Sequence, residues 1–100
     1  MNVRLENIRH VFFIGIGGIG MSALARYFHQ MGCAVAGYDR TESDLTRTLE
    51  SEGMSVFYED NVDLIPQDFE TSNEANLVIY TPAVPQDLGI RDTLQNRGFT

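Results

Sequence analysis

Apolar residues in this chain fall into short continuous runs that are separated by segments with helical spacing. Four runs have the length and composition of strands: Val11–Ile14, Cys33–Tyr38, Met54–Tyr58 and Leu77–Tyr80. Three segments place apolar residues three and four positions apart, as amphipathic helices do: Met21–Met31, Thr41–Glu52 and Gln86–Arg97. The stretch from Glu59 to Asn76 is acidic and poorly periodic, which favours a solvated loop over a metal site.

Strands that alternate with helices predict an α/β fold with a Rossmann-like parallel sheet. Right-handed crossovers and a glycine-rich turn after the first strand lead to the strand order 3-2-1-4, with helices on both faces of the sheet. Phe99 and Thr100 would begin a fifth strand beside the fourth. A length of 100 residues and a hydrophobic content of 43% allow one domain with one core.

The helical segments each have a predicted buried side. At about 100° per residue, one stripe of the first helix collects small and apolar residues: Gly20, Ala23, Leu24, Tyr27 and Met31. This phase places Gly20 against the sheet. The second helix is expected to bury Leu45 and Leu49, and the last helix is expected to bury Ile90 and Leu94.

The connection between the first strand and the first helix is dense in glycine. Gly15, Gly17 and Gly20 fit the G-x-G-x-x-G pattern, and Gly18 adds a fourth glycine within six residues. Bare backbone lets a diphosphate approach closely, and free N–H groups at a helix start carry partial positive charge. The pattern therefore predicts a phosphate-bearing ligand. The alternative is that the glycines only form a sharp turn in an α/β domain.

An acidic residue follows the second predicted strand. Asp39 lies 19 residues after Gly20, where a Rossmann fold places a carboxylate that meets a ribose hydroxyl or a base donor. The alternative is an aspartate that stabilises a turn or caps a helix before Thr41. The spacing favours the ligand contact.

Composition indicates which binding partners and which cellular compartment fit this chain. The net charge of -7 and the lack of any Lys/Arg cluster argue against nucleic acid and anionic membranes as partners. Cys33 is the only cysteine, so no intramolecular disulfide forms, and its position predicts a buried small hydrophobe. The first ten residues lack the apolar segment of a signal peptide, and no apolar run is long enough to span a bilayer. We expect a cytoplasmic protein.

Residue spacing does not indicate a catalytic centre. The chain has no G-x-x-x-x-G-K-[ST] pattern, no Cys or His cluster, and no Ser/His/Asp set that spacing alone would assemble. The sequence therefore predicts a domain that binds a ligand and contributes no catalytic residue.

The segment from Phe13 to Ser22 closely resembles the opening motif of the Mur ligases that add L-alanine in peptidoglycan synthesis. Three later segments also resemble that family: Gly37–Asp39 after the second strand, Thr46 with Leu49 and Gly53 in the second helix, and Leu77–Val84. The resemblance covers nearly all of the 100 residues, but only the N-terminal domain of a protein several times longer. Its specific part is the glycine segment with Met21 and Ser22.

The resemblance implies a domain that holds the UDP part of UDP-N-acetylmuramate. The implied contacts are Gly15, Gly17, Gly18, Ile19, Gly20, Met21 and Ser22 at the diphosphate, Asp39 and Arg40 at uracil, and Thr81, Pro82, Ala83 and Val84 along the uridine and sugar. It also implies that ATP and magnesium bind a central domain beyond this chain and that the amino acid binds a third domain. This domain would then hold no cofactor or metal and would be inactive alone.

The sequence departs from the family pattern at two places. Glu59 and Asp60 stand where the family often has Gly-His, and Tyr38 replaces a small residue beside Asp39. An alternative function is an NAD-binding domain of an oxidoreductase or a nucleotide-sensing regulator, since G-x-G-x-x-G with an acidic residue is also the dinucleotide pattern. That alternative does not explain the agreement over Thr81–Val84. A protein-interaction module without a ligand would leave the four glycines unexplained.

Overall fold

The computed structural model describes residues 5–85 and 87–99, and within them the chain forms one parallel sheet. Its strands are β1 (His10–Ile14), β2 (Ala34–Tyr38), β3 (Ser55–Phe57) and β4 (Asn76–Tyr80). Neighbouring strands follow the order β3-β2-β1-β4, and every pair is parallel. This confirms the fold class and strand order predicted from the sequence. Phe99 lies in no strand, and Thr100 lies outside the described residues.

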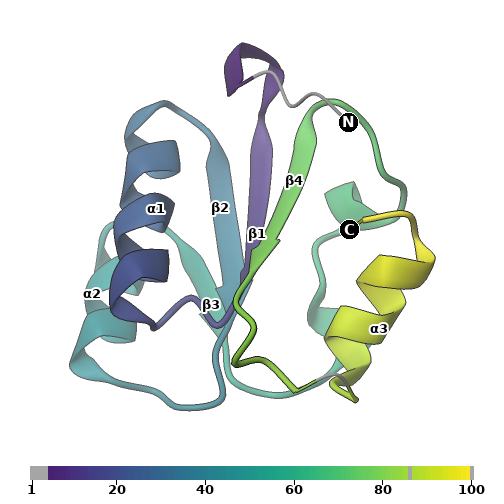
Figure 1. The fold of residues 1–100 in the computed structure, drawn as a ribbon. Helices are drawn as coiled ribbons and strands as arrows, with labels where there is room; N and C mark the ends of the chain where they lie inside the picture. Colours follow the sequence, from purple (N-terminus) through teal and green to yellow (C-terminus); the bar gives the residue numbers. More distant parts are fainter. Residues whose placement is uncertain (1–4, 86, 100) are drawn as a thin grey trace.

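Helices cover both faces of the sheet, as Figure 1 shows. Helices α1 (Ile19–Gln30) and α2 (Asp44–Ser51) lie on one side, and α3 (Gly89–Asn96) lies on the other. Three short 3-10 turns complete the described elements: Leu5–Asn7, Val62–Leu64 and Gln67–Phe69. The last two lie in the acidic stretch that the sequence analysis assigned to a loop.

Strand β1 supplies both layers of the core by alternation. Val11 and Phe13 pack in the layer beneath α1 and α2, while Phe12 and Ile14 pack in the layer beneath α3. All four side chains are at most 1% exposed. Fully burying a side chain of this size contributes about 1.5–3 kcal/mol, so β1 is the best anchored strand of the sheet.

The buried side of α1 differs from the predicted stripe. Met21, Ala25 and Phe28 face the core, at spacings of four and three residues. The residues of the predicted stripe are exposed: Gly20, Ala23, Leu24, Tyr27 and Met31. The helical period was right and the phase was wrong, because α1 carries two apolar stripes and packing against the sheet selects the one with Met21, Ala25 and Phe28.

The other two helices are shorter than predicted, and each has a defined start. Helix α2 begins after Ser43, whose hydroxyl accepts the Thr46 N–H at 3.2 Å while the Thr46 hydroxyl accepts the Ser43 N–H at 2.9 Å. This reciprocal pair is a capping box. Leu49 is buried as predicted and Leu45 only partly. In α3 both predicted inward residues are buried, whereas Gln86 lies outside the described residues.

Asp60 caps α3 from a distant part of the chain. Its Oδ2 accepts the Gly89 N–H at 2.8 Å, and its Oδ1 accepts the Ile90 N–H at 2.9 Å. The residue that precedes the helix, Leu88, provides no side-chain cap. A carboxylate at this place satisfies two otherwise unpaired N–H groups and lies at the positive end of the helix dipole. The segment after β3 is thereby tied to α3.

We expect Asp60→Ala to lower the free energy of unfolding by about 1–2 kcal/mol, because it leaves the first N–H groups of α3 without a protein acceptor. Urea unfolding measures the change. Glu59→Ala is the matched control, since it removes the neighbouring exposed carboxylate and should change stability by less than about 0.5 kcal/mol. Equal losses in the two variants would show that net charge, and not the cap, is responsible.

Candidate functional site

The glycine turn lies at the carboxyl edge of the sheet, where the strand order reverses. Strand β1 pairs with β2 on one side and with β4 on the other, so the chain connections leave its end in opposite directions. In open α/β sheets, ligands bind at this kind of position. The loop after β4 lies beside the turn, because a Cβ on Gly15 would be 3.6 Å from Val84 Cγ2 and 4.0 Å from Thr81 Oγ1. The structure therefore brings two of the predicted site segments together.

Backbone hydrogen bonds fix the shape of the turn. The Tyr38 carbonyl at the end of β2 accepts the N–H of Gly15 at 2.7 Å and that of Ile16 at 3.1 Å. Gly18 then donates to the Gly15 carbonyl at 3.2 Å, and Ser22 donates to the Gly18 carbonyl at 2.8 Å as the first bond of α1. The turn is thus held to the sheet and leads directly into the helix.

Three N–H groups at the start of α1 have no acceptor among the described residues, namely those of Ile19, Gly20 and Met21. The N-cap residue Gly18 has no side chain with which to cap them. Unpaired N–H groups at a helix N-terminus, together with the helix dipole, favour an anionic group. The turn therefore presents a seat of three neutral donors for an anion.

The four glycines of the turn differ in how much room the fold leaves for a side chain. Gly15 has φ +93°, a conformation that other residues rarely adopt, and a Cβ on Gly17 would lie 2.7 Å from Asp39 Oδ2 and 2.9 Å from Thr46 Cγ2. These two positions are explained by the protein itself. A Cβ on Gly18 would make only ordinary contacts, and one on Gly20 would meet nothing within 4 Å. The fold does not explain why these two exposed positions are bare.

Asp39 lies against the turn, with both carboxylate oxygens hydrogen-bonded to backbone. Its Oδ2 accepts the Gly17 N–H at 2.7 Å, and its Oδ1 accepts the Thr41 N–H at 3.0 Å. The side chain is partly buried. The sequence predicted that Asp39 contacts a ligand, with a turn aspartate as the alternative. The structure shows the hydrogen bonds of a turn aspartate. Arg40 beside it is exposed.

Ser22 of the predicted site faces inward, and so does Tyr38 beside Asp39. The Ser22 hydroxyl donates to the Ile19 carbonyl at 2.9 Å, and this side chain is buried. Tyr38, one of the departures from the family pattern, packs its ring against Phe57 with centroids 6.1 Å apart. Burial, followed by the negative charges of Asp60 and Asp39, raises the pKa of the Tyr38 phenol. The phenol is therefore neutral at pH 7.

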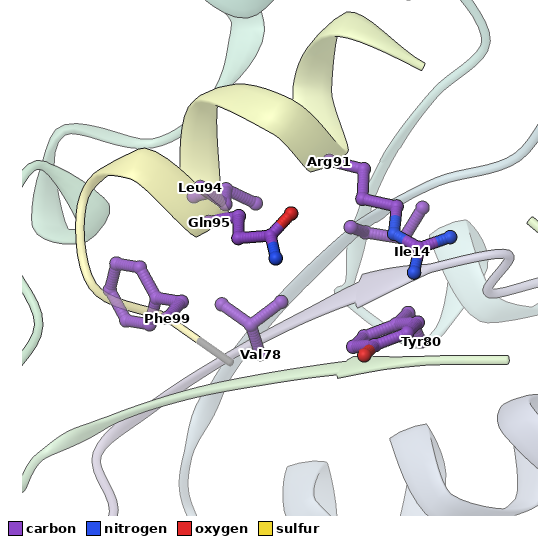
Figure 2. Close-up of a pocket in the computed structure, with 7 residues that line it drawn as sticks. All are labelled: Ile14, Val78, Tyr80, Arg91, Leu94, Gln95 and Phe99. Carbon is purple, nitrogen blue, oxygen red and sulfur yellow. The ribbon is translucent and has the colours of Figure 1, made fainter. Parts of the chain in front are cut away.

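Arg91 on α3 makes contacts that the sequence pattern did not indicate. Its Nη1 donates to the Val84 carbonyl at 3.0 Å, and its guanidinium lies 4.7 Å from the centroid of the Tyr80 ring. Figure 2 shows Arg91 reaching from α3 over Tyr80, above a pocket that also includes Ile14 and Val78. A guanidinium over an aromatic face is attractive, so Arg91 ties the loop after β4 to α3. Both contacts join α3 to another part of the chain and left no signal in the local sequence pattern.

The described residues contain neither a metal-binding cluster nor a helix able to span a membrane. Residues 5–85 and 87–99 contain no group of three or more His, Cys, Asp or Glu side chains that could hold a metal ion. Over the same ranges, no helix combines the length and the apolar character that crossing a membrane requires.

A model of the Mur ligase family, described as the catalytic domain of that family, matches residues 10–98. Because the match spans most of the chain, the chain belongs to the Mur ligase family. This confirms the resemblance that rested on the segment from Phe13 to Ser22 and does not favour the NAD-binding alternative.

Relatives similar to this chain carry the name of one member of this family. The UDP-N-acetylmuramate--L-alanine ligase of Christiangramia forsetii is 52% identical over 95 residues, which are 95% of this chain and 21% of that protein. The protein of the same name from Cytophaga hutchinsonii is 55% identical over 85 residues, 85% of this chain and 18% of that one. The crystal structure of UDP-N-acetylmuramate-alanine ligase MurC from Thermotoga maritima matches with TM-score 0.70 and 34% identity, covering 88% of this chain and 18% of that chain. The chain spans about a fifth of the length of these relatives.

Replacing glycines of the turn should separate the packed positions from the bare ones. Gly17→Ala is expected to lower the free energy of unfolding by about 1–3 kcal/mol, because its Cβ has no room between Asp39 and Thr46. Gly20→Ala should leave stability unchanged or raise it by up to about 1 kcal/mol, since alanine favours helix more than glycine does. Urea unfolding of the two variants compares them. A Gly17→Ala variant as stable as the parent would show that Asp39 and Thr46 can move away from the added Cβ without a loss of stability.

Proposed function

We propose that this domain holds the UDP part of UDP-N-acetylmuramate for an ATP-dependent ligase that adds L-alanine in peptidoglycan synthesis. The names of the relatives support this function, as does membership of the Mur ligase family. ATP, magnesium and the amino acid would bind parts of the ligase beyond this chain, and the reaction would take place in the cytoplasm. The domain's contribution is to bind and orient the nucleotide sugar.

The observation that carries this proposal is the anion seat at the start of α1. Three N–H groups there lack an acceptor among residues 5–85 and 87–99. The same place holds Gly18 and Gly20, the two glycines for which the packing of the fold leaves room for a side chain. A diphosphate accounts for both facts, because its oxygens accept from the free donors and its bulk needs a surface without side chains. We assign Ile19, Gly20 and Met21 as its direct donors.

The remaining predicted contacts are proposed around this seat. Arg40 is exposed next to Asp39, at the end of β2, and we assign it to the uracil end of the nucleotide. The loop Thr81–Val84 packs beside Gly15 and would line the uridine and sugar. Ser22 supports the turn through its bonds to Gly18 and Ile19.

We expect Gly20→Val to remove most UDP binding while the chain stays folded. The valine side chain would stand over the free donors, whereas the fold itself leaves room for it. Amide chemical shifts of the glycine turn, followed while UDP is added, measure the affinity and report the fold in the same spectra.

Ala23→Val is the matched control for that variant. It places the same valine side chain at another exposed position of α1, one turn further from the seat, and should leave UDP affinity within about twofold. A folded Gly20→Val variant with unchanged UDP affinity would show that the ligand binds elsewhere. Tight binding of NADH by the parent chain without any response to UDP would favour the dinucleotide alternative instead.

The 100-residue chain alone should release no phosphate from ATP in the presence of UDP-N-acetylmuramate and L-alanine. The sequence has no Walker lysine pattern, and the described residues include no metal-binding group, so the groups that activate phosphoryl transfer must come from elsewhere in a ligase. A phosphate-release assay on this chain, with a full-length relative as positive control, tests the prediction. Turnover by the chain alone would contradict a purely binding role.

A further inference from the structure

We propose that Asp39 is a positioning residue that acts on the nucleotide through the glycine turn and does not contact the uracil or the ribose. This inference rests on the proposed function for its ligand and on the geometry of the turn for its mechanism. It replaces the role that the sequence pattern suggested for this carboxylate. The direct contact with the uridine end is then left to other residues, of which Arg40 is the nearest in sequence.

Both oxygens of the Asp39 carboxylate are already engaged by the protein. Oδ2 accepts from Gly17 at 2.7 Å, a short bond for an N–H donor, and Oδ1 accepts from Thr41 at 3.0 Å. Hydrogen bonds to an ionised acceptor are roughly twice as strong as neutral ones. Moving this side chain toward a base would leave the Gly17 N–H without its acceptor in a partly buried place, which is unfavourable.

The surroundings of Gly17 explain why this bond can hold the turn. The backbone of Gly17 fits into a corner whose walls are the Asp39 carboxylate and the Thr46 methyl group, 2.7 Å and 2.9 Å from where a Cβ would stand. Thr46 is fully buried, and its hydroxyl accepts from Ser43 in the capping box of α2. The start of α2 thus supports the turn that begins α1.

This arrangement makes Asp39 act at the diphosphate end of the ligand. The corner fixes Gly17, and the chain runs from there through Gly18 to the three free donors at the start of α1. Donors held in place before a ligand arrives lose less conformational freedom when it binds. The carboxylate also carries a negative charge close to the diphosphate, so its acceptor oxygen and its charge should have opposite effects on affinity.

Two variants of Asp39 separate the acceptor from the charge. Asp39→Asn keeps one carbonyl oxygen for the Gly17 N–H but loses the charge and the acceptor of the Thr41 N–H, whereas Asp39→Ala loses the charge and both acceptors. Glu42→Ala is the control for net charge, because it deletes an exposed carboxylate from the same loop. Each variant is titrated with UDP and with uridine, which lacks the phosphates.

We expect Asp39→Ala to bind UDP about tenfold more weakly than Asp39→Asn, which also lacks the charge, because this is the effect of one lost positioning interaction. Asp39→Asn should bind UDP at least as well as the parent, and uridine affinity should stay within about twofold in both variants. Parallel loss of uridine and UDP affinity in Asp39→Ala would show a direct contact with the base or ribose and overturn the proposal. Equal UDP affinities of Asp39→Ala and Asp39→Asn would overturn it as well.

Hydrogen exchange of the Gly17 amide tests the positioning role without any ligand. Exchange should become at least about fivefold faster in Asp39→Ala, as expected for loss of one hydrogen bond, and should stay unchanged in Asp39→Asn and Glu42→Ala. Amides of Phe13 and Val35 in the central strands report whether the fold is intact. Slow Gly17 exchange in a folded Asp39→Ala variant would overturn the proposal even if UDP binds. If the parent bound neither UDP nor uridine, the proposed function would fail, and this exchange experiment would still decide the role of Asp39.

Discussion

The burial of β1 is the constraint on which the rest of this structure depends. Its core residues, Val11 to Ile14, are at most 1% exposed, and the strand pairs with neighbours on both sides. The position where the chain leaves the sheet is therefore fixed. Because the Tyr38 carbonyl accepts both Gly15 and Ile16, the pairing of β1 with β2 continues into the turn. The start of α1, with its unpaired N–H donors, is therefore held in place by the sheet.

Much of this organisation could be predicted from local sequence. Short apolar runs, of which the third alternates at Ser55, predicted the four strands, and the alternation of strands with helices predicted a parallel sheet with the observed order. The glycine pattern located the turn, and its agreement with a known family at Met21 and Ser22 was later supported by the match over residues 10–98. The apolar runs and the glycine pattern each involve neighbouring residues only, and each strongly favours one local structure.

The errors came from features that depend on distant contacts. The sequence of α1 carries two apolar stripes, one with Met21 and Phe28 and one with Leu24 and Tyr27, and only packing on the sheet selects the first. The partners of Asp60 lie 29 and 30 residues away, so no local pattern marks it as a helix cap. Local spacing also did not show that Asp39 and Thr46 lie where a Cβ on Gly17 would stand, so that the fold itself requires a glycine there.

The three helices differ in how their N-termini are satisfied, and this difference bears on how an acidic domain can bind an anion. Helix α2 has the capping box of Ser43, and α3 has the carboxylate of Asp60. Within the part of the chain that the structure describes, only α1 begins without a side-chain cap among these helices. Two N-termini are thus occupied by the protein's own groups, and an incoming anion finds free donors at the third. With a net charge of -7, the domain does not attract a diphosphate by its overall charge. The local donors of a preorganised turn must supply the affinity, and for this reason the groups that hold the turn matter as much as those that touch the ligand.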